Sequence, residues 1–417
     1  MSPSARRLAA CAALLAALPW VPGLDGNFAR SLISQMGIAA IFAISYSLLL
    51  GQTGLLSFGH AVYFGLGGYA AIHLLRAVNG GLAIPVPLVP LAGALAGLAA
   101  GIVFGAVATR RAGTIFALIT LGVGELVHAA SLMLPGFFGG EEGITASRTK
   151  TPHFLGLDFA SQLQVYYVIA FWLLVTALLA LAFMRTPVGR MCNAVRDNPE
   201  RAEFIGYNPQ RVRFIACAVS AAFAGLAGGL HAINYEIVTS EAVSATRSGE
   251  VLLMVYIGGV QHFAGAILGA VAITWLQVSM SDYTSAWLLY LGLLFMAIVV
   301  YAPGGLAAIA VKHAALARRR AVGAVVRAYA LALPAALLMV AGGVTLLEIA
   351  YRLSTQPDAG TRMRLFWIPM NASTPWPWVG AAAAAMAGLF LLRRAWPRVS
   401  AAWDLAGDET RAEALHG

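Results

Sequence analysis

Glu125 and His128 are the two side chains whose types and spacing come nearest to a chemical site in this sequence. A glutamate and a histidine three residues apart lie on one side of a helix, where carboxylate bundles use such a pair to bind a metal ion. A metal site of that kind needs further carboxylates, and the apolar stretches around the pair contain none. Two interpretations stay open: a buried hydrogen bond that positions helices, or a polar point facing a partner or a water-filled cavity.

The glycine-rich stretch 51–68 contains a second polar group, formed by Gln52, Thr53, Ser57 and His60. Glycines that interrupt a helix expose backbone groups, which in transport proteins line a cavity. The alternative is that these glycines only let helices approach closely. We favour a path for solutes at the polar group, with Thr120 and Glu125 as further candidates. His60 has a second interpretation, a bond to a carbonyl group freed by the break.

The amino-acid composition predicts which kind of secondary structure positions these polar residues. Of the 417 residues, 60% are apolar and 11% are charged, whereas a soluble globular protein has roughly 25% charged residues. This excludes a soluble enzyme, a disordered chain and a secreted domain held by disulfides. Eleven stretches are long and apolar enough to be membrane helices: 8–24, 31–50, 54–75, 83–108, 113–134, 164–184, 214–235, 251–279, 285–302, 328–347 and 376–392. Since they do not alternate as barrel strands do, we predict an all-α polytopic membrane protein.

Basic residues between the stretches indicate the side of each loop, because cytoplasmic loops are rich in lysine and arginine. Arg6-Arg7 place the N-terminus in the cytoplasm, and the loop 185–213 returns to that side. Lys312 and Arg318 would lie outside if 251–279 crossed the membrane once. We therefore predict that 251–279 is re-entrant or forms two short half-helices, which leaves about ten crossings and two cytoplasmic termini.

The loop 185–213 is predicted to contain a short helix at about 199–205. Asn198 is a good N-cap and Pro199 suits the first helical position. Gly206 can adopt the left-handed conformation that ends a helix. Such a short helix is marginal alone in water and needs a partner surface. It is either a coupling helix for a cytoplasmic motor subunit or an ordinary charged loop that touches lipid headgroups.

Four motifs in this order resemble one known family: Gly51–His60, Thr120–Glu125, Arg190–Gly206, and Glu250–Met254 followed by Gly258-Gly259. The chain resembles the permease subunits of branched-chain amino-acid ABC importers, in particular their M-type, over about residues 30–311. The resemblance implies a bacterial inner-membrane protein that works with a second homologous permease, two cytoplasmic ATPase subunits and a periplasmic substrate-binding protein. It implies that the coupling loop contacts the ATPase through Arg196, Asn198, Glu200, Arg201, Glu203, Phe204 and Gly206.

Two positions depart from the family pattern. Arg201 stands where the loop signature has a small residue, which makes the partner's surface uncertain. Gln261 replaces a glycine that usually follows Gly258-Gly259, which could alter packing or the lining of the path.

The predicted organisation has three parts. An N-terminal segment with the first membrane helix spans 1–30, the permease core spans 31–311, and an extension with two further helices spans 312–417. Because the chain lacks a phosphate-binding G-x-x-x-x-G-K-[ST] motif, ATP hydrolysis is expected in another chain. We expect no enzyme activity, cofactor, metal or nucleic acid.

The resemblance implies import of branched-chain amino acids, or of related small amino acids or amides such as urea, by alternating access. The alternative is an ion-coupled secondary transporter or channel that uses Glu125.

Overall fold

A computed structural model describes residues 3–22, 26–150, 158–318, 322–355, 362–366 and 368–416. Residues 1–2 and 23–25 of the predicted N-terminal segment thus lie outside the described part. The chain divides into two compact units, Met1–Ala308 and Ile309–Gly417. Each unit is described by itself.

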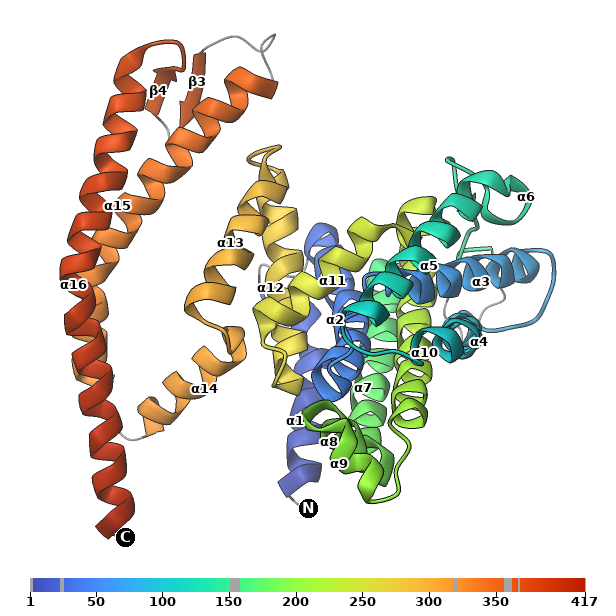
Figure 1. The fold of residues 1–417 in the computed structure, drawn as a ribbon. Helices are drawn as coiled ribbons and strands as arrows, with labels where there is room; N and C mark the ends of the chain where they lie inside the picture. The colour runs from blue at the N-terminus through green and yellow to red at the C-terminus, as the bar shows by residue number, and fades with distance from the viewer. Residues whose placement is uncertain are drawn as a thin grey trace. The chain divides into compact units, whose positions relative to one another are not determined.

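The first unit is almost entirely helical (Figure 1). Its helices are α1 (Pro3–Ala17), α2 (Asn27–Thr53), α3 (Ala61–Asn79), α4 (Val89–Ala108), α5 (Thr114–Met133), α6 (Pro135–Phe138), α7 (Gln162–Arg185), α8 (Pro187–Asp197), α9 (Pro199–Phe204), α10 (Pro209–Tyr235), α11 (Ala245–Gly258), α12 (Phe263–Ser281) and α13 (Trp287–Tyr301). Short 3-10 turns lie at Leu18–Trp20, Val86–Leu88 and Ser240–Val243. Two short strands, β1 (Ile144–Thr145) and β2 (Ile237–Val238), pair antiparallel.

Helix α14 (Gly305–Arg318) begins in the first unit and continues into the second. The second unit consists of α15 (Val322–Thr355), an antiparallel hairpin of β3 (Arg362–Leu365) and β4 (Ile368–Asn371), and α16 (Pro375–His416). Helices α15 and α16 touch through backbone, because a Cβ on Gly388 would lie 2.4 Å from the backbone nitrogen of Met339.

Nine helices among the described residues are long and apolar enough to cross a membrane, or ten if the bent pair α13 and α14 counts as one. The prediction of an all-α polytopic membrane protein is confirmed. The predicted stretch 8–24 is only partly helical, because α1 has 15 residues and a 3-10 turn follows it.

The predicted stretch 251–279 consists of two helices, α11 and α12, that fold back on each other. A Cβ on Gly269 would lie 1.8 Å from the carbonyl oxygen of Met254, and one on Gly258 would lie 1.9 Å from the carbonyl oxygen of Gly265. Residues later in α12 thus contact residues earlier in α11, so the two helices run antiparallel. The chain reverses at residues 259–262, where Gly259 has a φ of +114°. Helix α11 has 14 residues, which is shorter than a spanning helix needs. Helix α12 has 19 residues and is long and apolar enough to cross a membrane. The prediction of two short half-helices is therefore wrong for α12, because its apolar run continues past the glycines to Ser281.

Helix α2 is the central helix of the first unit (Figure 1). Most of its residues are buried, and α7, α8, α10, α11 and α12 all contact it. The ring of Phe42 on α2 also packs against that of Phe64 on α3. A helix that is apolar on all sides is buried among others, and α2 has this character from Ile33 to Leu50.

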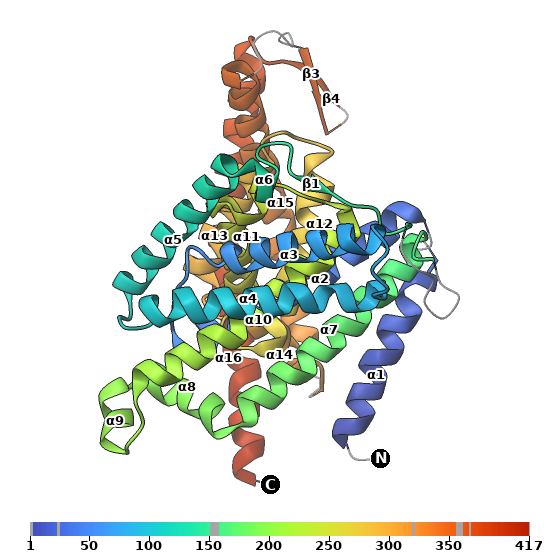
Figure 2. The same ribbon diagram turned by 90° about the vertical axis from the view of Figure 1, so that its right-hand side faces the viewer.

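Helices α3, α4 and α10 lie side by side and meet at glycines (Figure 2). A Cβ on Gly225 of α10 would lie 2.2 Å from the carbonyl oxygen of Gly93 in α4. Small residues allow backbones in a membrane to approach closely enough for dispersion contacts to hold them together. The glycines at this interface therefore act mainly in packing.

Replacing Gly225 by alanine is expected to destabilise the protein, because the added methyl group has no space against α4. Overpacking of this kind costs about 1–3 kcal/mol. Thermal unfolding in detergent measures the effect, and Gly122→Ala is the matched control, because a Cβ there meets nothing within 4 Å. Equal melting temperatures for the two variants would contradict this packing argument.

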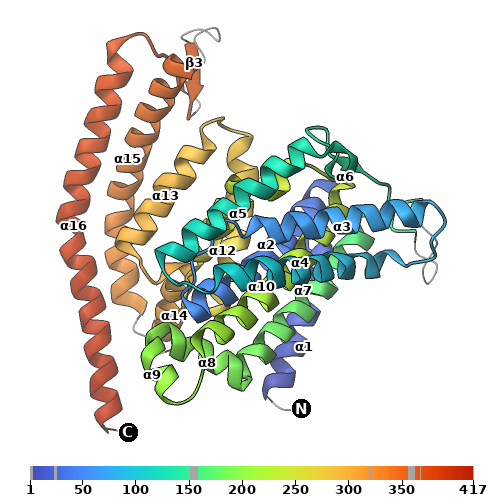
Figure 3. The same ribbon diagram turned by 45° about the vertical axis from the view of Figure 1, so that its right-hand side comes forward.

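The basic loops of the first unit gather at one end. Gly105, near the end of α4, lies against Cys217, near the start of α10. Arg110 and Arg111 therefore lie at the end where α10 begins. Helices α8 and α9 and the start of α1 lie at this same end (Figures 1 and 3).

Candidate functional site

The polar group predicted at 51–68 lies where the chain breaks between α2 and α3. Helix α2 ends at Thr53, and Gly54 adopts the left-handed conformation with a φ of +69°. The next helix begins only at Ala61, so residues 54–60 are irregular. The hydroxyl of Tyr46 donates to the carbonyl oxygen of Ser57 at 3.0 Å, which fixes the irregular segment against α2.

The predicted path residues around this break are packed inside the protein. Thr53 donates to the carbonyl oxygen of Leu49, and the Thr120 hydroxyl accepts from the backbone N–H of Phe58 at 3.2 Å. The Ser57 hydroxyl is buried without a partner among the described residues. The structure thus brings Gln52, Thr53, Ser57, His60 and Thr120 to one region, and their role in a path stays a prediction.

His60 lies in an aromatic cluster beside this break. Its ring is 5.6 Å from that of Phe42, 5.0 Å from that of Tyr46 and 5.5 Å from that of Tyr63, between centroids. Its Nε2 is 3.0 Å from the hydroxyl oxygen of Ser45. The partner is therefore a hydroxyl, and the carbonyl partner considered from the sequence is not the one observed. The cluster fills the space between α2 and α3 with rings.

A cavity lies between α2, α3, α10, α11 and α12. Phe42 separates it from the ring of His60. The cavity encloses about 850 Å³, counting its open mouth. Phe42 and Phe64 belong to its lining, and their rings pack against each other at 4.7 Å between centroids. An outer chamber lined by the segment 237–246 shares His231, Tyr235, Arg247, Glu250, Gln277 and Trp287 with this cavity. The two chambers therefore adjoin each other, with these side chains between them.

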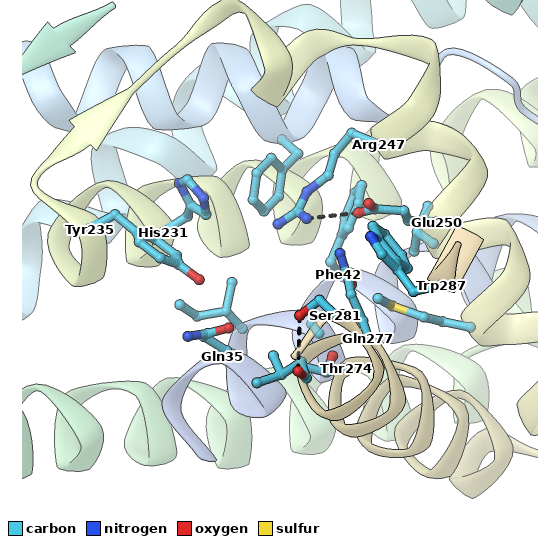
Figure 4. Close-up of a pocket in the computed structure, with 16 residues that line it drawn as sticks. Gln35, Phe42, His231, Tyr235, Arg247, Glu250, Thr274, Gln277, Ser281 and Trp287 are labelled. Atoms are coloured by element: carbon cyan, nitrogen blue, oxygen red, sulfur yellow. Dashed lines mark hydrogen bonds and ion pairs between the residues drawn. The ribbon is translucent and has the colours of Figure 1, made fainter. Parts of the chain in front are cut away.

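Arg247 and Glu250 are the charged side chains of the cavity lining. An Arg247 Nη1–H donates to Glu250 Oε2 at 2.8 Å, and the guanidinium lies 5.1 Å above the Phe64 ring. Figure 4 shows the pair facing a space that the hydroxyl of Tyr235 and the amides of Gln35 and Gln277 also border. Such a cavity can hold a small molecule with polar and apolar parts.

Sequence reasoning missed this pair. Both residues lie just before the apolar stretch 251–279, and they belong to the first two turns of α11, which begins at Ala245. Glu250 is the first residue of the family motif at residues 250–254, and this was the only feature of the sequence that could have indicated the pair. His231 also lines the cavity, and its ring lies 4.5 Å from that of Tyr235 between centroids, with the two rings tilted by 39°.

Arg148 holds the segment before α7 against the end of α10, next to the cavity. Its guanidinium donates to the carbonyl oxygens of Phe159, Ile233 and Asn234 at 3.0, 3.1 and 3.0 Å. Burial lowers the pKa of the guanidinium, and the nearby Glu236 carboxylate opposes this shift. These hydrogen bonds hold the chain in place beside Tyr235, at the edge of the cavity.

The predicted short helix in the loop 185–213 is present as α9. Asn198 caps it by accepting from the backbone N–H of Arg201 at 2.9 Å, and Gly206 has a φ of +91°. The helix ends at Phe204, one residue earlier than predicted. Its Ala202 packs inward, whereas the Phe204 side chain is 90% exposed.

The exposed face of α9 consists of predicted coupling residues. Glu200, Arg201 and Glu203 are exposed together with Phe204. Ile205, next to Phe204, is also 62% exposed. Aromatic side chains are enriched in protein–protein interfaces, so this face is suited to docking a partner.

Helix α8, which precedes α9, was not predicted and links this face to the break in α2. Arg196 Nη1–H donates to the carbonyl oxygen of Gly51 at 2.5 Å, and the Asn193 amide donates to Gln52 Oε1 at 3.0 Å. Arg196 was predicted to contact the ATPase, but its guanidinium points towards α2 and also bonds Asp197 at 3.0 Å. Gln52, predicted on the path, is a partner of α8.

Glu125 lies apart from the cavity, on the exposed side of α5. Leu118 and Leu126 near it are 65% and 64% exposed. Among the described residues it has no hydrogen-bond or salt-bridge partner. His128 points elsewhere, with Nδ1 at 3.2 Å from the carbonyl oxygen of Ser240. Within the described part of the chain, no three His, Cys, Asp or Glu side chains converge as a metal site requires.

Comparisons with known proteins agree with this architecture. The family model described as "Branched-chain amino acid transport system / permease component" matches residues 28–303. The high-affinity branched-chain amino acid transport system permease proteins LivM of Salmonella typhimurium and Escherichia coli are each 28% identical over 324 residues, covering 72% of this chain and 75% of the relative. The probable permease LivH of Methanocaldococcus jannaschii is 24% identical over 245 residues, covering 57% and 75%. No solved structure matches the chain at a significant level.

Proposed function

Because the chain belongs to the branched-chain amino acid transport system permease family, we propose that it is one membrane-spanning subunit of an ATP-driven importer. The importer carries branched-chain amino acids, or related small amino acids or amides, across a bacterial inner membrane. The chain pairs with a second homologous permease. Two cytoplasmic ATPase subunits supply the energy, and a periplasmic binding protein delivers the substrate.

The hydrogen bonds between α8 and α2 are the observation that carries this proposal. A surface that binds an ATPase subunit must be connected to a part of the permease that can move. A broken helix, such as α2 with the irregular segment 54–60, is a part of this kind. Residues Asn193 and Arg196 connect the exposed face of α9, through α8, to the end of α2. The break that follows this end adjoins the aromatic cluster around His60, which reaches the cavity through Phe42.

The proposed mechanism is alternating access. Closure of the ATPase subunits displaces α9 and α8, and the end of α2 follows because it is hydrogen-bonded to α8. The segment 54–60 and the rings around His60 then rearrange, which connects the cavity to the cytoplasmic side. The gathering of Arg110, Arg111 and the arginines of 185–213 at one end of the unit supports placing that end in the cytoplasm.

The exposed Glu125 supports the pairing with a second permease. A carboxylate in a spanning helix is costly next to lipid, so it faces protein or a water-filled cavity. Since Glu125 does not face the cavity of its own chain, the second permease is the proposed neighbour of this side of α5.

Reconstitution tests the function. The chain, the second permease, the ATPase subunits and the binding protein are placed in vesicles, and uptake of labelled leucine is measured with and without ATP. We expect uptake only with ATP and only when all subunits are present. Uptake by the single chain that follows an ion gradient and is lost in Glu125→Gln would instead identify a secondary transporter.

A further inference from the structure

The cavity contains an ion pair whose groups are only partly used. The Arg247 and Glu250 side chains are 29% and 15% exposed, so both remain accessible from the cavity. A guanidinium has five N–H donors and a carboxylate accepts about four hydrogen bonds. Among the described residues, the only polar partner of either side chain is the other one. Most of the donors and acceptors of the pair are therefore available to a ligand.

The fold does not depend on this pair. An ion pair three residues apart on one helix stabilises that helix little when water reaches it. Helix α11 is held instead by close backbone contacts with α12 at Gly258 and Gly269, and by the Ser244 cap on its first turn. A ligand can therefore separate the two charges without loosening the helix.

We propose that Arg247 and Glu250 form a binding site for the two charged ends of a zwitterionic α-amino acid. The assignment rests on the proposed function. It adds the residues that hold the substrate, and it selects amino acids over amides as the substrate class. The ligand's carboxylate binds the guanidinium through two parallel hydrogen bonds, and its ammonium group binds the Glu250 carboxylate. Two opposite charges on neighbouring side chains of the lining, 2.8 Å apart, match the two opposite charges of one small molecule.

The remaining lining suits the rest of such a ligand. Gln35, Tyr235 and Gln277 provide further hydrogen-bonding groups around the pair (Figure 4). Ile38 and Met254 provide apolar wall for an aliphatic side chain. An uncharged amide such as urea could accept from the guanidinium and donate to the carboxylate, but it has no charge of its own to replace the one that each group loses when the ion pair separates. The site therefore favours amino acids over amides.

Protection of a cysteine in the cavity tests the site without requiring transport. Thr246, next to Arg247, lines the outer chamber and is exposed. Thr246→Cys is introduced together with Cys11→Ser, since Cys192 and Cys217 are buried. The complete transporter in lipid nanodiscs is labelled with a maleimide in the presence of L-leucine, L-leucinamide or 4-methylpentanoate. Glu142→Cys, which is exposed and outside the cavity, is the control position.

We expect L-leucine to slow labelling of Thr246→Cys but not of Glu142→Cys. The two probes that lack one charge should need about tenfold or higher concentrations, the loss expected for one missing charge-assisted interaction. Arg247→Gln should remove the preference for leucine over leucinamide, and Glu250→Gln the preference for leucine over 4-methylpentanoate. A variant that only disturbed the fold would weaken protection by all three probes equally.

The site assignment is wrong if leucine gives no protection, or if protection is the same in Arg247→Gln and in the parent protein. Vesicle uptake distinguishes this result from failure of the proposed function. ATP-driven leucine uptake that persists unchanged in Arg247→Gln overturns the site alone, whereas absence of ATP-driven uptake in the unmodified transporter overturns the importer.

Discussion

Phe204→Asp is expected to weaken the association of this chain with the ATPase subunits by about thirtyfold, the effect of losing one interface residue that contributes about 2 kcal/mol. Phe204 lies at the end of α9, its side chain is 90% exposed, and charged residues surround it. An aromatic ring in that position gains most when a partner covers it, and a carboxylate there would lose solvation on docking. Co-purification of the ATPase with the tagged permease pair measures the effect.

Tyr283→Asp is the matched control for this experiment. Tyr283 is also 90% exposed but follows α12, away from α8 and α9. It should leave the association unchanged. A second variant, Glu200→Lys with Gly206→Val, changes the charge of α9 and removes the left-handed residue that ends it. If Phe204→Asp and the double variant both co-purify the ATPase as the parent does, α9 is not the docking surface.

The double variant Asn193→Ala with Arg196→Ala is expected to reduce ATP-driven uptake by about tenfold or more while the ATPase stays bound. Both side chains donate hydrogen bonds to the end of α2, one to the Gln52 side chain and one to the Gly51 carbonyl oxygen. Removing two such bonds, one of them from a charged donor, costs about 2–4 kcal/mol of coupling between α8 and α2. ATP would then be hydrolysed without moving the break at residues 54–60.

Arg190→Ala is the control for the double variant. Arg190 is also on α8, but its guanidinium donates to the carbonyl oxygen of Arg185 at 3.2–3.3 Å and makes no bond to α2. Uptake and ATP hydrolysis are measured on the same vesicles. Normal uptake by the double variant would contradict the proposed link, and loss of ATPase binding would show that these residues belong to the docking surface instead.

The sequence by itself determined the fold class and the family. The apolar stretches predicted the positions of most long helices, because the cost of burying a peptide group in lipid forces each stretch to be helical. The caps at Asn198 and Gly206 predicted α9 to within one residue, because capping depends on a few neighbouring atoms. The glycines of 251–279 predicted a break, and the structure has one at 259–262.

Only the tertiary structure decided which polar residues meet. Arg247 and Glu250 are unremarkable in the sequence, and they line a cavity because α11 folds back on α12 beside α2. Gln52 contacts Asn193, 141 residues away. Glu125, the one charge within an apolar stretch, lies on the outside of its own chain. Hydropathy and capping are local sums over neighbouring residues, whereas a cavity depends on how helices distant in sequence pack together, which no local pattern encodes.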